Sequence, residues 1–350
     1  MITLKTDGIR LDFDPGTGLI DGFTVKDGGI EITPLHRAPW VGTGERLPGG
    51  LAAHMYTLGG DFFCAPFGQQ TDEVPLHGWP PNSPWTVDRV SSAGLAARLK
   101  KPVSGAELTK ELWLLEDHPF VYQRHTFSGG QGRLPVANHA NLSLRNGGLI
   151  RTSAKQVWMT PPAPLETDPN RGRSGLSYPA RSFDPARFPA TTGHADMTRY
   201  PWFPQHEDFV IGVEARGSIL GWTAVTRPVE GDVFLSLRRA DCLPMTMLWH
   251  SNGGRDYAPW NGRHFGCLGI EEGAADHLLG EDHGLSLTGP GAIDLSAAGE
   301  VCVTHVIGAI AWPDGCAVRN VELADGQLLV YGDNGAHRSV PLDGSALNST

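Results

Sequence analysis

The stretch ELTKELWLLEDHPFVYQRHTF, residues 107–127, carries the clearest fold pattern in the chain. It divides into two strand-like segments, Glu107–Leu115 and Phe120–Phe127, on either side of an Asp117-His118-Pro119 turn. Strands joined by so short a connection pair as antiparallel neighbours, whereas parallel strands need a crossover of about a dozen residues or more. This stretch therefore predicts a β-hairpin within an antiparallel sheet.

Further strand-like segments lie on both sides of this hairpin. Many are rich in Val, Ile, Leu, Thr and aromatic residues, and most are bounded by Gly, Asp, Asn or Pro. They include Ile9–Phe13, Leu95–Leu99, Phe209–Ala215, Asp232–Leu237 and Val301–Ile310. Helical periodicity is scarce, and Gly273–Leu279 is the one segment where we expect a short helix. We predict an all-β fold, a large and mostly antiparallel β-sandwich with few short helices.

The chain has the composition of a folded protein with many turns. Its 350 residues include 45 Gly and 27 Pro, which are dispersed and so indicate short strands joined by turns. Residues 34–86 and 160–206 interrupt the strand pattern, and long loops inside a compact domain are usually functional or disordered. Their Trp and Phe content favours order. Residues 311–350 again resemble short strands that complete the sandwich. We find no linker and expect a single domain over residues 1–350.

Charge and cysteine usage argue against several classes of protein. The net charge is −10 and the cations are scattered, so nucleic acid is not an expected partner. The N-terminal segment MITLKTDGIRLDF has no apolar signal-peptide core and no apolar run reaches 18 residues, so we expect a cytoplasmic protein without a membrane partner. The five cysteines form no CxxC, and the close pair His264 and Cys267 has no second pair near it. Neither disulfides nor a metal site are expected, and no nucleotide-binding motif implies a cofactor.

Two histidine segments have side chains suited to chemistry. His77 stands beside a glycine in PLHGW, ahead of a strand that we expect to begin near Trp85. His139 lies in the strand-like segment NHANLSL, residues 138–144, next to Asn138. Histidine titrates near neutral pH and can hold or donate a proton. The alternatives are a loop histidine bonded to a backbone carbonyl and a satisfied core histidine.

A third segment, GCLGIEEG at residues 266–273, ends an apolar strand with Glu271 and Glu272. Adjacent strand residues point to opposite faces, so we expect one glutamate in a groove and the other in solvent. A carboxylate in a partly dry pocket has a raised pKa and suits general base catalysis. An exposed acidic turn is the alternative.

These three segments, in this order, resemble the galactose mutarotase-like superfamily, which includes the aldose 1-epimerases. Its members carry a His-Gly segment after a Gly-rich loop, a second histidine followed by a polar and apolar run, and an apolar strand that ends in Glu. The matching segments are Pro75–Gly78, Asn138–Leu142 and Leu268–Glu271, within a resemblance that spans about residues 50–275. The arginine that is usual in the family's early loop has no match near residues 59–67.

The resemblance implies a sugar-sized groove on one face of the sandwich and a ring-opening reaction. Glu271 would remove the proton of the anomeric hydroxyl, and His139 would give a proton to the ring oxygen from the opposite side of the pyranose ring. His77 would bind the sugar. The expected partner is a monosaccharide or sugar derivative, with no cofactor and no metal. We prefer Glu271 to Glu272 because it directly follows the apolar run, as in the family.

Other side chains suit the same ligand by their chemistry. Carboxylates bind sugar hydroxyls, and aromatic rings stack on the apolar face of a sugar or belong to the core. The candidates are Glu207, Asp208, Asn138, Trp202, Phe203, Trp260, Trp79 and, more weakly, Trp249.

Two alternatives to an epimerase remain open. A carbohydrate-binding or regulatory protein could share the fold without the chemistry. Hydrolysis or lyase chemistry could also use the same sandwich. Hydrolysis needs two carboxylates about 5 to 10 Å apart, for which Glu207 or Asp208 could join Glu271.

Overall fold

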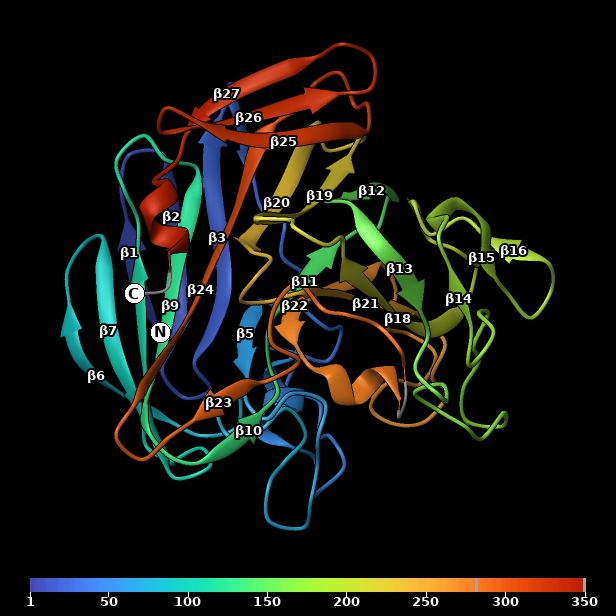
Figure 1. Cartoon of the computed structure of the whole chain (residues 1–350), viewed down its shortest axis with the longest axis horizontal. Coiled ribbons are helices and arrows are strands. Elements are labelled where there is room, and N and C mark those ends of the chain that lie inside the picture. The colour runs from blue at the N-terminus through green and yellow to red at the C-terminus, as the bar shows by residue number, and fades with distance from the viewer. Residues whose placement is uncertain (281–282, 349–350) are drawn as a thin grey trace.

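Two large antiparallel sheets pack face to face in the computed structural model, which describes residues 1–280 and 283–348 (Figure 1). Every ladder between strands in these residues is antiparallel, which confirms the predicted all-β sandwich. The hairpin of residues 107–127 forms as β8 (Ala106–Trp113) and β9 (Phe120–Gly129), with Trp113 opposite Tyr122.

The first sheet has eleven strands and holds the N-terminus at one edge. In spatial order its strands are β1 (Ile2–Lys5), β2 (Ile9–Asp14), β3 (Leu19–Asp27), β5 (Asp61–Cys64), β11 (Val136–Ser143), β22 (Cys267–Ala274), β21 (Met245–Asn252), β18 (His206–Glu214), β13 (Lys155–Met159) and β14 (Arg181–Ser182), while β4 (Ile30–Ile32) pairs with β3.

The second sheet has nine strands and includes the β8–β9 hairpin. Its spatial order is β17 (Arg199–Tyr200), β12 (Gly148–Thr152), β19 (Leu220–Arg227), β20 (Asp232–Arg239), β24 (Glu300–Ala311), β9, β8, β7 (Gly94–Leu99) and β6 (Trp85–Val90). Strand β6 begins at Trp85, as expected from the sequence.

The main core lies between the two sheets, because alternate residues of each strand point inward. Phe13 and Ile270 from the first sheet and Leu108 and Phe234 from the second belong to this core cluster. A second apolar cluster covers the outer face of the first sheet, where Met247 and Phe62 pack with Trp40 of the 34–86 segment. This segment is therefore packed on the sheet, and it covers the face that carries the candidate site.

The C-terminal strands form a separate three-stranded sheet, β25 (Val318–Ala324), β26 (Gln327–Gly332) and β27 (His337–Pro341), drawn in red at the top of Figure 1. The expectation that residues 311–350 complete the sandwich is wrong, because these strands form a sheet of their own. Residues 349 and 350 lie outside the described part of the chain. Val321 and Leu328 pack with Leu235 and Ile310 of the nine-stranded sheet. The outer face of the nine-stranded sheet is therefore also apolar, and the three-stranded sheet covers it as a third layer.

The remaining elements are short. Two-stranded pairs are formed by β10 (Gly132–Leu134) with β23 (Ile293–Leu295) and by β15 (Phe188–Pro189) with β16 (His194–Ala195), and the 3-10 helices are η1 (Ala53–Thr57), η2 (Pro185–Arg187), η3 (Asp276–Leu279) and η4 (Gly344–Leu347). The short helix expected over residues 273–279 forms in its second half, as η3. The prediction is wrong for the first half, because Gly273 lies in β22 and pairs with Ala137 of β11. Among the described residues, no helix has the length and apolar character needed to cross a membrane.

Candidate functional site

A pocket of about 280 Å³ opens on the outer face of the eleven-stranded sheet. This volume is near the lower end of small-molecule sites, which usually measure about 300 to 1,000 Å³. Its floor consists of side chains from β5, β11, β18, β21 and β22, and its walls come from the 34–86 segment, residues 161–165 and the loop before β22. Both long loops that interrupt the strand pattern thus contribute to the site.

His139 and Glu271 meet on the floor of this pocket. They are directly opposite each other on β11 and β22, and the Nε2 atom of His139 lies 3.1 Å from Oε1 of Glu271. Residues opposite each other in neighbouring strands share a face, so the register alone brings the two side chains into contact. The expectation of an acid and a base on opposite sides of a sugar ring is therefore wrong, because the two groups lie side by side.

Burial shapes the protonation of this pair. It raises the pKa of Glu271 well above its usual value and lowers the pKa of His139 to about 3. Desolvation favours a neutral acid beside a neutral imidazole, so the pair holds one proton in the contact between Oε1 and Nε2. Within the described residues, Oε2 of Glu271 and Nδ1 of His139 have no hydrogen-bond partner. The hydrogen-bonding capacity of both buried atoms is therefore unused by the described part of the chain.

Glu272 points to the opposite face, between the two sheets. Its carboxylate accepts hydrogen bonds from Thr223 Oγ1 at 2.6 Å and Thr246 Oγ1 at 2.9 Å, and Arg238 Nη1 lies 2.9 Å away. Strand alternation thus separates the two glutamates, as expected. The expectation that one would meet solvent is wrong, because both faces of the sheet are covered and Glu272 is fully buried.

The His-Gly segment holds His77 at the pocket through an unusual backbone. His77 has a φ of 67° and Gly78 a φ of 73°, both in the left-handed region. A Cβ atom on Gly78 would lie 1.9 Å from the carbonyl oxygen of Ala65, so only glycine fits there. Asn82 fixes the turn by donating from Nδ2 to the carbonyls of Leu76 and Gly78. The glycine that follows the histidine therefore has a structural cause.

Asn82 also positions His54, a pocket residue that the sequence analysis missed. Its Oδ1 atom lies 3.0 Å from both the backbone nitrogen and Nδ1 of His54. The ring centroid of His77 lies 5.3 Å from that of His54 and 5.5 Å from that of His139. Burial lowers the pKa of His54 to about 4 and that of His77 well below its usual value. The pocket thus has three neutral imidazoles, each able to donate and to accept one hydrogen bond.

An aromatic wall with one cation forms another side of the pocket. Trp249 and Trp260 both line it, and the guanidinium of Arg255 lies 4.5 Å from the ring centroid of Trp260. Arg255 is the one Lys or Arg among the described lining residues. The sequence analysis missed Arg255 because its loop, NGGRDYAPW, has no pattern that relates it to the histidines. Only the folded structure shows that Arg255 lies near the pocket histidines.

Glu207 supports this wall from behind and does not line the pocket. Its carboxylate accepts hydrogen bonds from Nε1 of Trp249 and from Oγ of Ser251, and Nε of Arg255 lies 3.3 Å from Oε1. The neighbouring Asp208 points to the other face of β18. It accepts from the backbone nitrogens of residues 175 and 176 and from the Tyr178 hydroxyl, and it contacts His206.

The remaining predicted ligand residues also lie elsewhere. Trp202 packs on His250, with ring centroids 4.4 Å apart, and Asn138 is buried on the inner face of β11, opposite in direction to His139. Trp79 and Phe203 pack against the main core. Of the predicted site residues, the fold therefore brings together His77, His139, Glu271 and Trp260, with Trp249 beside them.

Glu271 is the one carboxylate among the described residues that line the pocket. Glu207 and Asp208 are bonded to their own partners, so neither faces Glu271 across the cavity. A hydrolase of the usual kind needs a second carboxylate at that position. The pocket does not have the arrangement that the hydrolytic alternative requires.

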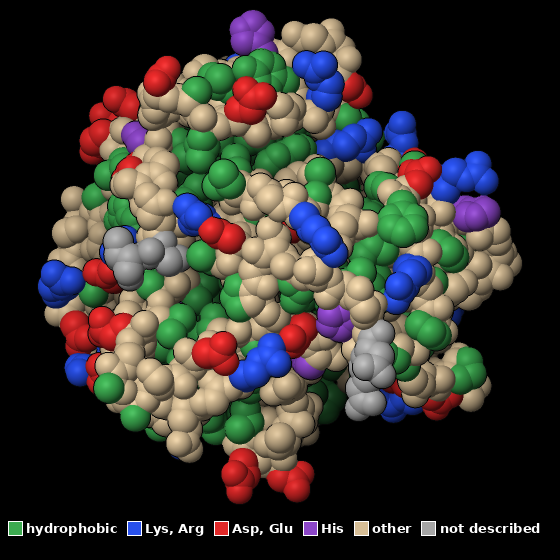
Figure 2. Space-filling view, viewed as in Figure 1, with side chains coloured by type: hydrophobic (Ala, Val, Ile, Leu, Met, Phe, Trp, Pro, Cys, Tyr) green, Lys and Arg blue, Asp and Glu red, His purple; other side chains and the backbone are tan. Residues whose placement is uncertain are grey.

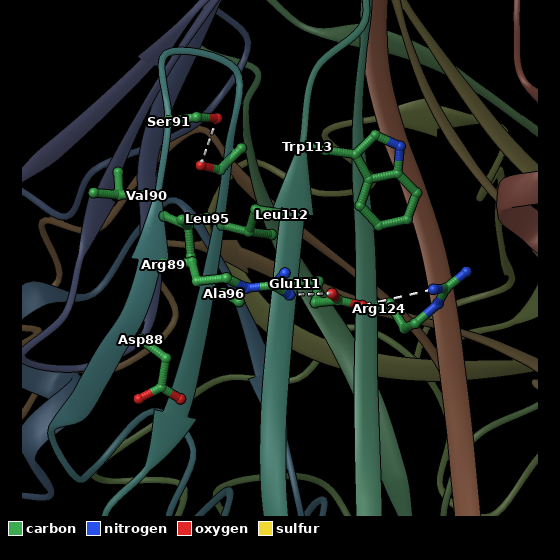
Figure 3. A pocket seen from close by; sticks show the side chains of 11 residues that line it. Asp88, Arg89, Val90, Ser91, Leu95, Ala96, Glu111, Leu112, Trp113 and Arg124 are labelled. Carbon is green, nitrogen blue, oxygen red and sulfur yellow. Dashed lines mark hydrogen bonds and ion pairs between the residues drawn. The ribbon is translucent and has the colours of Figure 1, made fainter.

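A larger hollow, of about 810 Å³, lies over β6 to β9 and contains none of the predicted site residues (Figure 3). Glu111 stands between Arg89 and Arg124, at 3.5 and 3.6 Å. These ion pairs are partly exposed and stabilise little. On the face shown in Figure 2, acidic and basic side chains are likewise interspersed. We regard the hollow as a solvated sheet surface, and the smaller pocket as the candidate site.

Comparisons with known proteins agree with this architecture. No family model and no curated protein matches the sequence. The fold is similar to a candidate aldose 1-epimerase from Escherichia coli K12 (TM-score 0.60, 14% identity, 88% of this chain and 98% of that one). It is also similar to a galactose mutarotase related enzyme from Lactobacillus acidophilus (TM-score 0.56, 11% identity, 89% and 98%). The chain has the galactose mutarotase-like fold.

Proposed function

We propose that this chain is a carbohydrate isomerase of the aldose 1-epimerase type, which interconverts the two anomers of a monosaccharide or sugar derivative. The observation that carries the proposal is the contact between His139 and Glu271 on the floor of a small buried pocket. An acid and a base that share one proton can accept a proton from one oxygen and give a proton to another. The galactose mutarotase-like fold supports the same class of reaction.

The reaction would use the pair in its charge-separated form, reached when the shared proton passes from Glu271 to His139. The Glu271 carboxylate takes the proton of the anomeric hydroxyl while the His139 imidazolium gives a proton to the ring oxygen. The bond between C1 and the ring oxygen breaks, and C1 becomes an aldehyde. After rotation about the C1–C2 bond, the reverse transfers close the ring on the other face. No proton is gained or lost overall.

The side-by-side placement of acid and base suits this reaction. The anomeric hydroxyl and the ring oxygen are bonded to the same carbon, so both can be reached from one side of the sugar. His77 and His54 would hydrogen-bond the hydroxyls, Trp260 would cover an apolar face of the ring, and Arg255 would meet an electron-rich oxygen. These roles need neither a redox cofactor nor a second carboxylate.

NMR of freshly dissolved sugars tests the proposal. A panel of aldoses and sugar acids is followed with and without the protein, and faster anomer exchange is expected for at least one sugar. No acceleration across the panel, with line broadening that reveals binding, would favour a carbohydrate-binding protein and contradict the epimerase. Release of a reducing sugar from a disaccharide would instead indicate hydrolysis.

A further inference from the structure

Behind the aromatic wall lies a second group of ligand-bearing side chains, outside the proposed reaction site. His36, His264 and Cys267 are fully buried, and one ligand atom from each lies within 4.8 Å of the other two. The sequence shows only the pair His264 and Cys267. His36 comes from the 34–86 segment, more than 200 positions away, and the fold places it beside them.

The two imidazoles face each other through Nε2, at 3.1 Å. Nδ1 of His264 lies 2.7 Å from Oγ of Ser251, and that hydroxyl gives its single proton to Glu207 at 2.9 Å. The Ser251 oxygen therefore accepts a hydrogen bond from the Nδ1–H group of His264. This tautomer leaves a lone pair on Nε2 of His264, directed at His36. Metal-binding histidines are usually oriented in this way, by a hydrogen bond from the other ring nitrogen.

We propose that His36, His264 and Cys267 form a zinc-binding site. Two imidazole nitrogens and one thiolate are ligands that zinc prefers. Around a tetrahedral zinc with Zn–N bonds of about 2.0 to 2.1 Å, the two nitrogens would stand about 3.4 Å apart, so the 3.1 Å separation requires only a small opening. Binding releases the thiol proton of Cys267 to solvent, and the ring proton of His36 moves from Nε2 to Nδ1, so that both Nε2 atoms offer a lone pair to the metal.

The surroundings of the three side chains give a metal ion a path from solvent and leave the Cys267 thiol able to bind it. A surface hollow of about 420 Å³ is lined in part by His36 and connects this ligand with solvent. Arg145 and Arg263 stand at this hollow, while Glu207 lies behind His264 through Ser251. Among the described residues, the Cys267 thiol donates one long hydrogen bond, of 3.9 Å, to Oδ1 of Asn141.

The zinc would sit directly behind the candidate pocket. The Trp249 ring stacks on His264 at 5.7 Å, and the Trp260 ring meets His264 edge to face at 5.1 Å. The metal would hold the wall in place and would not touch a ligand in the pocket. Its presence is therefore independent of the proposed epimerase activity, and either proposal can fail alone.

Cobalt serves as a coloured substitute for zinc in the purified full-length chain. We expect one Co²⁺ per chain, with a thiolate-to-cobalt charge-transfer band in the near ultraviolet that zinc abolishes. Cys267→Ser should lose the band. Cys64→Ser should keep it, because Cys64 is equally buried in the same sheet but outside the cluster. A wild-type chain without the band, or a band that survives in Cys267→Ser, would overturn the site.

The hydrogen bond that Ser251 accepts from His264 offers a second test, because loss of this bond and unfolding would affect the cobalt band differently. Ser251→Ala should keep the cobalt band, because all three ligands remain. It should weaken zinc binding by about 10- to 100-fold, which is the usual effect of losing a partner that orients a ligand. Zinc affinity equal to that of the wild type would contradict the orientation of His264 on which the site is built.

Discussion

His139 and Glu271 share one proton and have different roles in the proposed reaction. Replacement of Glu271 removes the base that takes the anomeric proton, and replacement of His139 removes the acid that gives a proton to the ring oxygen. Glutamine has the shape of glutamate but cannot take up a proton at neutral pH. Imidazole can be replaced by the smaller asparagine amide, which still forms hydrogen bonds but cannot donate a proton to a ring oxygen. Both substitutions therefore test chemistry while leaving much of the polar pocket intact.

Glu271→Gln should abolish anomer exchange while sugar binding survives. The matched control is Glu272→Gln at the neighbouring position, which faces Arg238 between the sheets. Weakening a buried ion pair lowers stability, by about 3 to 5 kcal/mol when one partner is lost, but should leave exchange per folded molecule unchanged. NMR exchange rates and urea unfolding separate the two effects. Normal exchange in Glu271→Gln would exclude this residue as the base.

His139→Asn should slow exchange by at least about a hundredfold, the low end of the contribution of general acid catalysis. His125→Asn is its control, because His125 is also buried but stacks on Phe63 in the interior of the sandwich, with ring centroids 3.9 Å apart. Exchange rates are compared at equal concentrations of folded protein. A near-normal rate for His139→Asn would remove this residue from the acid role.

At the scale of elements, one turn positions the His77 ring, and Gly78 controls that turn. Gly78→Ala would place a Cβ atom at 1.9 Å from the Ala65 carbonyl oxygen and at a φ of 73°, so the turn must move. We expect a loss of at least about 2 kcal/mol of stability and weaker sugar binding. Thermal unfolding and NMR titration measure both.

Gly50→Ala separates the steric clash from the cost of a left-handed backbone. Gly50 has a φ of 81°, but a Cβ atom there would meet nothing within 4 Å. The control should lose about 1 kcal/mol and bind the sugar normally. Equal effects of the two substitutions would show that the contact with Ala65 does not hold His77 in place.

Strand patterns made part of the framework of the site predictable. Strand alternation sends Glu271 and Glu272 to opposite faces, as predicted, whereas the register that puts His139 opposite Glu271 was not predicted, because both strands are buried along almost their whole length. Alternation also sends Asn138 and Asp208 away from the pocket, a consequence that residue chemistry alone did not reveal. His54 and Arg255 come from loops, whose positions depend on tertiary contacts such as Asn82 and Glu207. No local pattern encodes those contacts.

At the scale of the whole molecule, many buried histidines make the fold sensitive to acid. Burial lowers the pKa of eight of them, to about 4 or about 3 where a value is defined: His36, His54, His77, His125, His139, His250, His264 and His305. The unfolded chain binds these protons near pH 6.5, and the folded chain binds them only at a lower pH. The stability from neutral histidines is therefore complete above pH 6.5 and is lost as the pH falls.

Four buried carboxyl groups act in the opposite direction. Burial raises the pKa of Asp61 to about 6 and also raises those of Glu207, Asp232 and Glu271. Their protonated forms are favoured in the folded chain, so their contribution grows as the pH falls towards 4. Eight histidines outnumber four carboxyl groups, and the net effect is a loss of stability in acid.

We expect the free energy of unfolding to fall steeply between pH 6.5 and 4. A net uptake of at least about three protons on unfolding near pH 5 corresponds to a slope of about 4 kcal/mol per pH unit. Urea unfolding at a series of pH values measures this slope. His125→Asn removes one buried histidine and should reduce the slope by about 1.4 kcal/mol per pH unit. A wild-type free energy of unfolding that is constant over this range would contradict the prediction. It would mean that the histidines bind protons equally well in the folded and the unfolded chain, despite their burial in the fold.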